Sequence, residues 1–200
     1  MYDFSVVEKN LKDKGYEVKV YATLKEAAEY LDKVIDNTTV GIGGSGTVKE
    51  SGLYETLQTH NKEVVWHWFQ TPSDEARVKA MNTDVYLTSV NGMAETGEMV
   101  SIDGCGNRVA SMLFGHNKVY YLIGRNKIVK TYEEAVWRAR NIASPQRAKQ
   151  MGRKTPCAVN ADKCYDCKSP ERICNGMVTL WGPMMGMAAE ILLIDEDLGL

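Results

Sequence analysis

The sequence predicts an α/β domain with a mostly parallel sheet and helices on both faces. Strand and helix patterns alternate along most of the chain, which is typical of parallel sheets covered on both sides. Two capping boxes mark helix starts. The 200 residues fit one domain with a substantial core, so we expect a single domain over residues 1–200.

The N-terminal quarter contains helix, strand and helix patterns in turn. A helix is expected over residues 5–14, ending at Gly15, and residues 17–21 alternate like a short strand. Thr23 and Glu26 form the first capping box, and the helix after it carries an apolar face up to about Ile35.

The middle of the chain continues the alternation. Five strands are expected, at residues 39–43, 64–69, 85–90, 99–103 and 119–123. Thr131 and Glu134 form the second capping box, and the helix that follows is expected to reach Ala143. After Pro145 the pattern changes: residues 152–176 have no apolar period and are expected to form a loop. Two further strands are expected at residues 177–181 and 189–194.

Charge and targeting signals restrict the function classes. Lys and Arg number 24 against 26 Asp and Glu, so the chain has no general positive field for nucleic acid. Residues 1–12 lack a signal-peptide core, and no segment is apolar enough to cross a bilayer. We therefore expect a cytoplasmic protein with neither nucleic acid nor membrane as a partner.

The strongest chemical signal is a C-x6-C-x2-C-x6-C cluster. It consists of Cys157, Cys164, Cys167 and Cys174. Four neighbouring thiolates repel one another unless a cation neutralises them, and both Zn²⁺ and iron–sulfur clusters accept four cysteines. Two disulfides are the alternative, but a cytoplasmic location disfavours them. A metal-binding loop at residues 152–176 is therefore predicted.

The spacing does not separate the two metal centres. Zinc sites favour two Cys-x-x-Cys pairs and this cluster has one, which favours a 4Fe-4S cluster and leaves zinc as the alternative.

A glycine-rich turn at residues 41–47 is the second signal. It is expected between a strand and a helix, where its candidate ligand-binding residues are Gly43, Gly44, Ser45, Gly46 and Thr47. Glycines allow close backbone approach, and hydroxyls and free amides bind anions. The turn lacks the Gly-Lys-Ser/Thr of a Walker A loop and the full dinucleotide fingerprint. The alternative is a tight turn in which Ser45 or Thr47 only caps the helix.

Polar residues at two strand ends form the third signal. Ligand sites of open α/β sheets lie outside strand carboxyl ends. We expect the cluster to line one crevice, although each member has a structural alternative as a turn or cap residue. It contains Asn91, Glu95, Asp103, Asn107 and Arg108.

Two weaker features have structural interpretations. Residues 66–69 alternate as Trp-His-Trp-Phe, and core packing is favoured over an aromatic ligand shelf. Arg125, Lys127 and Lys130 lie near a strand end, where a solvated surface is favoured over contact with an anion.

Taken in order, these motifs resemble the lactate-utilisation (LUD) domain family. The resemblance is carried by residues 41–47, 102–108, 119–129, the helix with Arg138 and Arg140, and the block 156–174. It implies the fold shared by ribose-5-phosphate isomerase, glucosamine-6-phosphate deaminase and CoA-transferases. It also implies a link to the oxidation of lactate to pyruvate, in which relatives work beside iron–sulfur and other redox proteins.

The resemblance also suggests catalytic residues. CoA-transferases of this fold use a glutamate nucleophile and the sugar-phosphate isomerases a carboxylate base, so Glu95 and Asp103 are the candidate catalytic acids. Cys105 departs from the small polar residue expected in the second motif, and a structural thiol is favoured over a nucleophile there.

These features leave three hypotheses for function. The favoured one is a LUD-type protein, a subunit of a lactate-oxidising system, that binds an anionic metabolite and passes electrons through an iron–sulfur cluster to a redox partner. The alternative is a CoA-transferase-like or isomerase-like enzyme acting on a phosphorylated or CoA substrate, with structural zinc. A zinc-bearing scaffold or sensor is the third. A homodimer is expected from the fold alone.

Overall fold

Two β-sheets form the framework of the protein in the computed structural model, which describes residues 2–200. The larger sheet has six strands, and every neighbouring pair in it is parallel. In spatial order they are β1 (Glu17–Tyr21), β10 (Ala188–Ile194), β7 (Lys118–Gly124), β4 (Val85–Thr88), β2 (Thr39–Ile42) and β3 (Glu63–Val65). The predicted α/β fold is confirmed.

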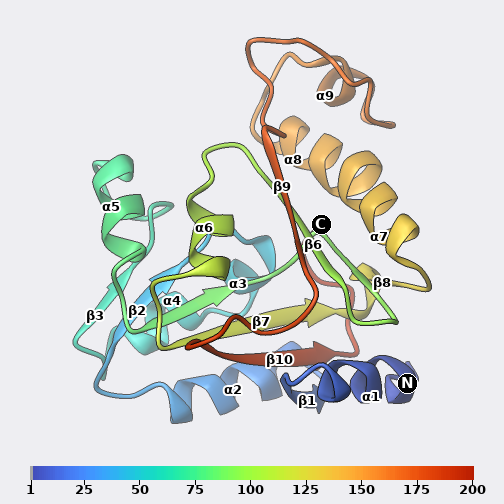
Figure 1. The fold of residues 1–200 in the computed structure, drawn as a ribbon. Coiled ribbons are helices and arrows are strands. Elements are labelled where there is room, and N and C mark those ends of the chain that lie inside the picture. The colour runs from blue at the N-terminus through green and yellow to red at the C-terminus, as the bar shows by residue number, and fades with distance from the viewer. Residues whose placement is uncertain (1) are drawn as a thin grey trace.

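Helices cover both faces of this sheet (Figure 1). Successive side chains of a strand point to opposite faces, so Tyr121 joins one buried cluster and Leu122 the other. The first cluster includes residues of α1 (Ser5–Asp13), α5 (Ser73–Ala80) and α6 (Asn107–Leu113). The second includes residues of α2 (Leu24–Val34), α3 (Gly46–Glu50) and α4 (Leu53–Leu57). The alternation read from the sequence therefore places a core on each side.

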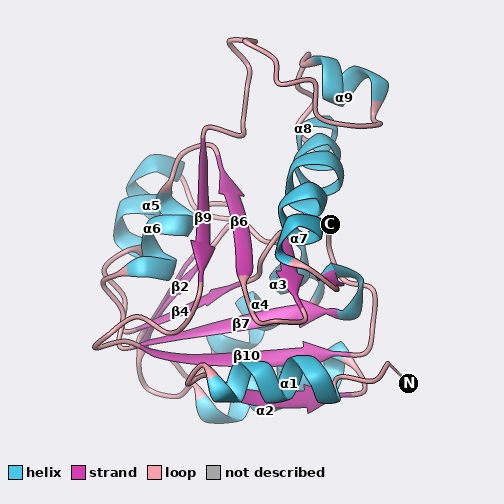
Figure 2. Ribbon diagram, turned by 45° about the vertical axis from the view of Figure 1, so that its right-hand side comes forward, coloured by secondary structure: helices cyan, strands magenta, loops and turns pink. Residues whose placement is uncertain are grey.

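The smaller sheet is mixed and crosses the larger one (Figure 2). Its order is β8 (Ile128–Val129), β5 (Gly92–Ala94), β6 (Met99–Asp103) and β9 (Gly176–Leu180). β6 pairs antiparallel with β5 and with β9, whereas β5 and β8 are parallel. The strands expected at residues 99–103 and 177–181 thus exist, but they belong to this second sheet. β5 and β8 are too short to show a sequence period.

The prediction of a strand over residues 64–69 is wrong beyond Val65, where β3 ends. Residues 66–69 form a turn in which the amides of Phe69 and Gln70 donate to the Trp66 carbonyl. The Gln70 side chain also accepts from the Trp66 amide, so this backbone is bonded locally and not to a neighbouring strand. Strand alternation consequently does not decide which side each aromatic residue faces.

The helix that starts at the second capping box continues past Pro145. It consists of α7 (Tyr132–Arg138), a π-helical turn (Ala139–Ala143) and α8 (Ser144–Gln150). Proline has no N–H to donate to the preceding turn, and a π-helical turn is a known way to shift the bonding register there. The Ser144 hydroxyl also donates to the Ala139 carbonyl, at 2.8 Å. The prediction that this helix ends near Ala143 is therefore wrong.

Residues 152–176, here called the cysteine segment, connect α8 to β9 and project beyond both (Figure 1). The segment is mostly irregular, as expected, but it includes the short helix α9 (Pro156–Asn160). Its C-terminal end is held against the turn after β6: the Asn175 amide donates to the Asp103 carbonyl, at 3.0 Å. No helix within residues 2–200 has the length and apolar character needed to cross a membrane.

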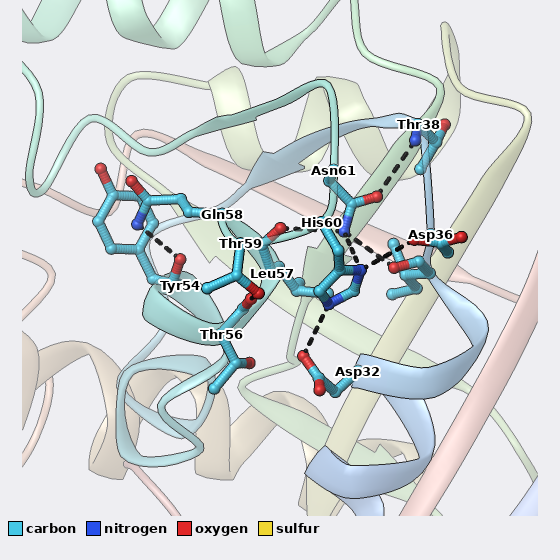
Figure 3. A network of polar contacts seen from close by, with 11 residues as sticks. Asp32, Asp36, Thr38, Tyr54, Thr56, Leu57, Gln58, Thr59, His60 and Asn61 are labelled. Carbon is cyan, nitrogen blue, oxygen red and sulfur yellow. Dashed lines mark hydrogen bonds and ion pairs between the residues drawn. The ribbon is translucent and has the colours of Figure 1, made fainter.

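A polar network holds the end of α2 against the turn after α4 (Figure 3). The two ring nitrogens of His60 lie 3.1 Å from carboxylate oxygens of Asp32 and Asp36. The hydrogen bond to Asp32 is the largest cause of a raised pKa of His60, and Asp36 adds to it. The protonated imidazole therefore links two acidic positions near the end of one helix.

We predict that this link weakens as the pH rises. Because the folded-state pKa of His60 is raised, its contribution to stability is fully present below the ordinary histidine pKa and is lost as the pH passes the folded-state pKa. His60→Asn should therefore lower the melting temperature more at about pH 6 than at about pH 9. Thermal melts followed by circular dichroism measure the difference. Glu29→Gln, an exposed change on the same helix, is the control, and equal losses at both pH values would contradict the prediction.

Candidate functional site

A cavity of about 570 Å³ lies at the carboxyl ends of three neighbouring parallel strands. Gly44 follows β2, Ser89 follows β4 and Lys127 follows β7, and all three residues line the cavity. The remaining walls come from residues 67–77, from the turn between β6 and α6, from α8, from the cysteine segment and from Gly199 and Leu200. This is the position at which open α/β sheets bind ligands.

The cavity brings together most of the residues predicted from the sequence. Its lining includes Gly44, Ser45, Gly46, Asn91, Asp103, Asn107 and Arg108. Gly43 and Thr47 lie directly behind this lining, where Gly43 adjoins Arg108 and Thr47 bonds to Lys127.

Glu95 does not line the cavity, so the expectation that it shares this crevice is wrong. Its carboxylate lies 3.5 Å from the Tyr2 hydroxyl, and its backbone carbonyl accepts from the Asn10 side chain of α1. The reason is topological: β5 and β6 are antiparallel, so Glu95 after β5 lies at the opposite end of the smaller sheet from Asp103, which ends β6 and lines the cavity.

The glycine turn combines capping with close packing. The Ser45 hydroxyl accepts from the Val48 amide at 3.2 Å and so caps α3. This agrees with the alternative interpretation of the turn, in which Ser45 caps the helix. A Cβ on Gly43 would lie 2.9 Å from the Tyr86 hydroxyl and 3.0 Å from a side-chain carbon of Arg108. Gly43 is therefore required because another side chain passes next to its backbone.

Asp103 and Asn91 have structural partners inside the cavity wall. The Asp103 carboxylate accepts from the amides of Cys105, Gly106 and Val109, at 3.2 to 3.3 Å, and so stabilises the start of α6. The Asn91 side chain accepts from the Ile102 amide at 2.8 Å. Catalysis by Asp103 stays a prediction.

Arg108 is buried and joins the two sheets. Its guanidinium donates to the Ser89 carbonyl after β4, at 2.9 Å, and to the Ile102 carbonyl in β6, at 2.7 Å. It also donates to the Asn91 side chain at 3.0 Å. Burial lowers the pKa of Arg108, whereas Asp103, 3.9 Å away, opposes that shift. The sequence predicted that Arg108 binds a ligand. In the structure its guanidinium already donates hydrogen bonds to backbone carbonyls of the protein.

Lys127 lies at the floor of the cavity and was expected on a solvated surface. It is 3% exposed, and its ammonium nitrogen lies 2.8 Å from the Thr47 hydroxyl and 2.9 Å from the Ser89 hydroxyl. Burial, with Arg138 and Arg108 nearby, lowers the pKa of Lys127 to about 7. Within residues 2–200 no carboxylate lies within the 4.0 Å of an ion pair with it.

An aromatic and cationic wall faces the glycine turn. Trp68 lies against Gly44, and the Arg147 guanidinium stacks 4.7 Å from the Trp68 ring. His67 also lines the cavity, and burial lowers its pKa to about 4, so the ring is neutral. Its Nδ1 atom is buried without a hydrogen-bond partner among the described residues. Core packing was predicted for residues 66–69; it is confirmed for Trp66 and wrong for Phe69, which is exposed, and His67 and Trp68 line the cavity.

The lining is strongly cationic. It contains two carboxylate side chains, Glu50 and Asp103, and six cationic ones. The cationic residues are Arg77, Arg108, Lys127, Arg147, Arg153 and Arg172. The near-balanced charge of the whole chain therefore does not reveal the local excess of positive charge in this cavity.

Sequence signals for the missed residues were present but indirect. Ala143, Arg147, Gln150 and Met151 all line the cavity at helical spacing, which a helix continued through Pro145 would have shown. Lys127 is preceded by a strand that is apolar on both faces, which favours a buried strand end. Arg153 and Arg172 gave no signal, because the irregular cysteine segment has no period from which to place them.

The four cysteines of the predicted metal site are free and half-buried. A thiol set of this kind is chemically suited to zinc or iron–sulfur. Within residues 2–200, however, no three His, Cys, Asp or Glu side chains are gathered closely enough to hold a metal ion. The structure therefore leaves the predicted metal site untested, and it stays a prediction. Cys105, the fifth thiol, is exposed and lines the cavity.

Comparison with known proteins concerns the whole chain. A family model described as LUD domain matches residues 5–191. The solved crystal structure of a DUF162 family protein from Deinococcus radiodurans is similar, with a TM-score of 0.54 and 14% sequence identity. That match covers 97% of this chain and 99% of the other, and at this identity it shows the fold alone. No curated protein matches the chain.

We predict that replacing Lys127 changes how stability depends on pH. A lysine side chain in an unfolded chain has a pKa of about 10.4. Above the folded-state value of about 7 the unfolded chain therefore binds more protons, and the free energy of unfolding rises with pH. Relative to Lys127→Met, the wild-type protein should gain about 3 kcal/mol between about pH 7 and about pH 10.

Urea denaturation at several pH values measures this difference. Lys130→Met, at an exposed lysine three positions away, should leave the dependence unchanged. Parallel curves for the wild-type protein and Lys127→Met would show that Lys127 titrates as an ordinary surface lysine.

Proposed function

Because the chain belongs to the LUD domain family, we propose that it binds an anionic metabolite of 2-hydroxy-acid utilisation in the cavity after β2, β4 and β7. The observation that carries this proposal is the excess of cationic side chains in one cavity: five arginines line it, with Lys127 at its floor, against the two carboxylate side chains of Glu50 and Asp103. Grouped like charges repel one another, and a bound anion reduces that repulsion.

The cations differ in how they are neutralised. Arg77 pairs with Asp74, and Arg172 lies 3.8 Å from Asp166. Lys127, Arg147 and Arg153 make no ion pair with any carboxylate of residues 2–200. These three are the groups available to a ligand, and they approach from β7, from α8 and from the cysteine segment. An anion between them would therefore touch three parts of the fold.

The size and charge of the cavity favour a second candidate ligand class. About 570 Å³ falls within the range of about 300 to 1,000 Å³ typical of small-molecule sites. A 2-hydroxy acid such as lactate has one carboxylate, whereas the excess of cations suits more than one negative charge. A phosphorylated or CoA-type ligand, as expected for a CoA-transferase-like or isomerase-like enzyme, is therefore the second candidate.

A metal centre in the cysteine segment is a separate part of the proposal. Its support is the four free thiols in one segment and the two N–H groups that approach the Cys164 sulfur, from Asp166 at 3.4 Å and from Arg140 at 3.8 Å. Donors of this kind tune thiolates that bind metals. An iron–sulfur cluster would transfer electrons to a redox partner, whereas zinc would only stabilise the fold of the cysteine segment.

We predict that Arg147→Gln weakens anion binding about tenfold or more, because a charge-assisted hydrogen bond contributes about 1.5 to 3 kcal/mol. Isothermal titration calorimetry with lactate, pyruvate, pyrophosphate and CoA measures binding and ranks the two ligand classes. Lys25→Gln, which removes one positive charge from an exposed helix position, is the matched control. Failure of all four anions to bind the wild-type protein would refute the proposal.

We predict that anaerobically purified protein contains one metal centre per chain and that Cys164→Ser together with Cys167→Ser removes it. Metal and acid-labile sulfide analysis with a visible spectrum separates the alternatives, since zinc is colourless and sulfide-free. Cys105→Ser is the matched control, because this thiol lies outside the cysteine segment. Absence of both iron and zinc would overturn this part of the proposal.

A further inference from the structure

The direction of one hydrogen bond of the Lys127 amine can be assigned from its surroundings. Its nitrogen lies 2.8 Å from the Thr47 hydroxyl and 2.9 Å from the Ser89 hydroxyl. The Ser89 hydroxyl donates its own hydrogen to the Leu122 carbonyl at 2.6 Å, so towards Lys127 it acts as an acceptor. The amine therefore donates one N–H to Ser89, and a neutral amine has a second N–H and a lone pair at its other two positions.

We propose that the Lys127 amine is a nucleophile that forms an imine with an anionic aldehyde or ketone bound in this cavity. The inference rests on the proposed anion site and names its ligand class: a carbonyl compound bearing a carboxylate or a phosphate. It adds a covalent step to what would otherwise be simple binding.

The surroundings of Lys127 favour the nucleophilic form of the amine. Lysine becomes a nucleophile when it is desolvated or lies near other cations, because both effects disfavour the ammonium. Lys127 is 3% exposed, and Arg138 and Arg108 lower its pKa, with Glu50 opposing them. Among residues 2–200 no carboxylate forms the ion pair that would hold it protonated.

The position of Lys127 is also fixed in a way that suits a nucleophile. It ends the 3-10 turn Arg125–Lys127, directly after the central strand β7, and its two hydroxyl partners follow β2 and β4. Three parallel strands therefore hold one amine at the cavity floor. Arg147 and Arg153 line the same cavity, where they would hold the anionic group of the substrate.

The step balances without an oxidant or other co-reactant. The nitrogen lone pair forms a bond to the carbonyl carbon, and the π electrons move to the oxygen. The two hydrogens of the amine leave with that oxygen as water, and a carbon–nitrogen double bond remains. Hydride from borohydride would reduce this bond to a stable secondary amine, which fixes the ligand to Lys127.

The test is reductive trapping on the folded 200-residue protein. It is incubated with pyruvate or with dihydroxyacetone phosphate, treated with borohydride, digested and analysed by mass spectrometry. We expect one adduct, on the peptide that contains Lys127, with the more productive probe distinguishing carboxylate from phosphate ligands. Lactate, which has no carbonyl to attack, should give none.

Variants separate a nucleophile from a structural lysine. Lys127→Arg retains a long side chain that ends in N–H donors but cannot form the trapped adduct, so labelling should be lost; Lys130→Arg, at an exposed lysine, should retain it. If Lys127→Arg fails to fold, the peptide map of the wild-type protein decides alone. Equal labelling of many lysines, or none at Lys127, would overturn the inference. Calorimetric binding of pyruvate without an adduct would overturn only this step, whereas no binding of any anion would also remove the proposed function.

Discussion

The buried guanidinium of Arg108 is the interaction on which the rest of the arrangement depends. It bonds to the Ser89 carbonyl after β4 and to the Ile102 carbonyl in β6, so one side chain holds the two sheets together at the rim of the cavity. The same side chain explains the glycine turn, because a Cβ at Gly43 would lie 3.0 Å from it. Leaving a buried guanidinium without these acceptors would cost several kcal/mol, which makes the sheet crossing and the turn a single unit.

Local signals predicted most of the main sheet. Both capping boxes occur as expected, and the strands at residues 17–21, 39–43 and 189–194 appear with small shifts. The errors came from non-local effects. The second sheet depends on pairing between β6 and β9, which are far apart in sequence. Residues 66–69 have the composition of a strand, but their backbone hydrogen bonds form a turn. The helix continues through Pro145 by way of a π-helical turn, which the sequence pattern did not predict.

The candidate site was predictable where a motif lies at a strand end, and less so elsewhere. The glycine turn lines the cavity because it follows β2 at the carboxyl edge of the parallel sheet. Residues 103–108 also line it, although β6 belongs to the smaller sheet. Glu95 was misplaced because β5 is antiparallel to β6, so the end of β5 lies at the opposite end of the smaller sheet from Asp103. Lys127 was misjudged because charge alone suggests exposure, whereas its burial depends on hydroxyls 80 and 38 positions away in sequence.

The cysteine segment contributes two of the cationic side chains of the cavity, Arg153 and Arg172. Arg172 also donates to the backbone carbonyls of Cys167 and Cys174, so it belongs to both places at once. Shared groups impose thermodynamic reciprocity: whatever the cysteines bind would change the affinity for an anion by the same factor by which that anion changes theirs. If the cysteines bind a metal and the cavity binds an anion, Arg172 would therefore couple the two binding equilibria.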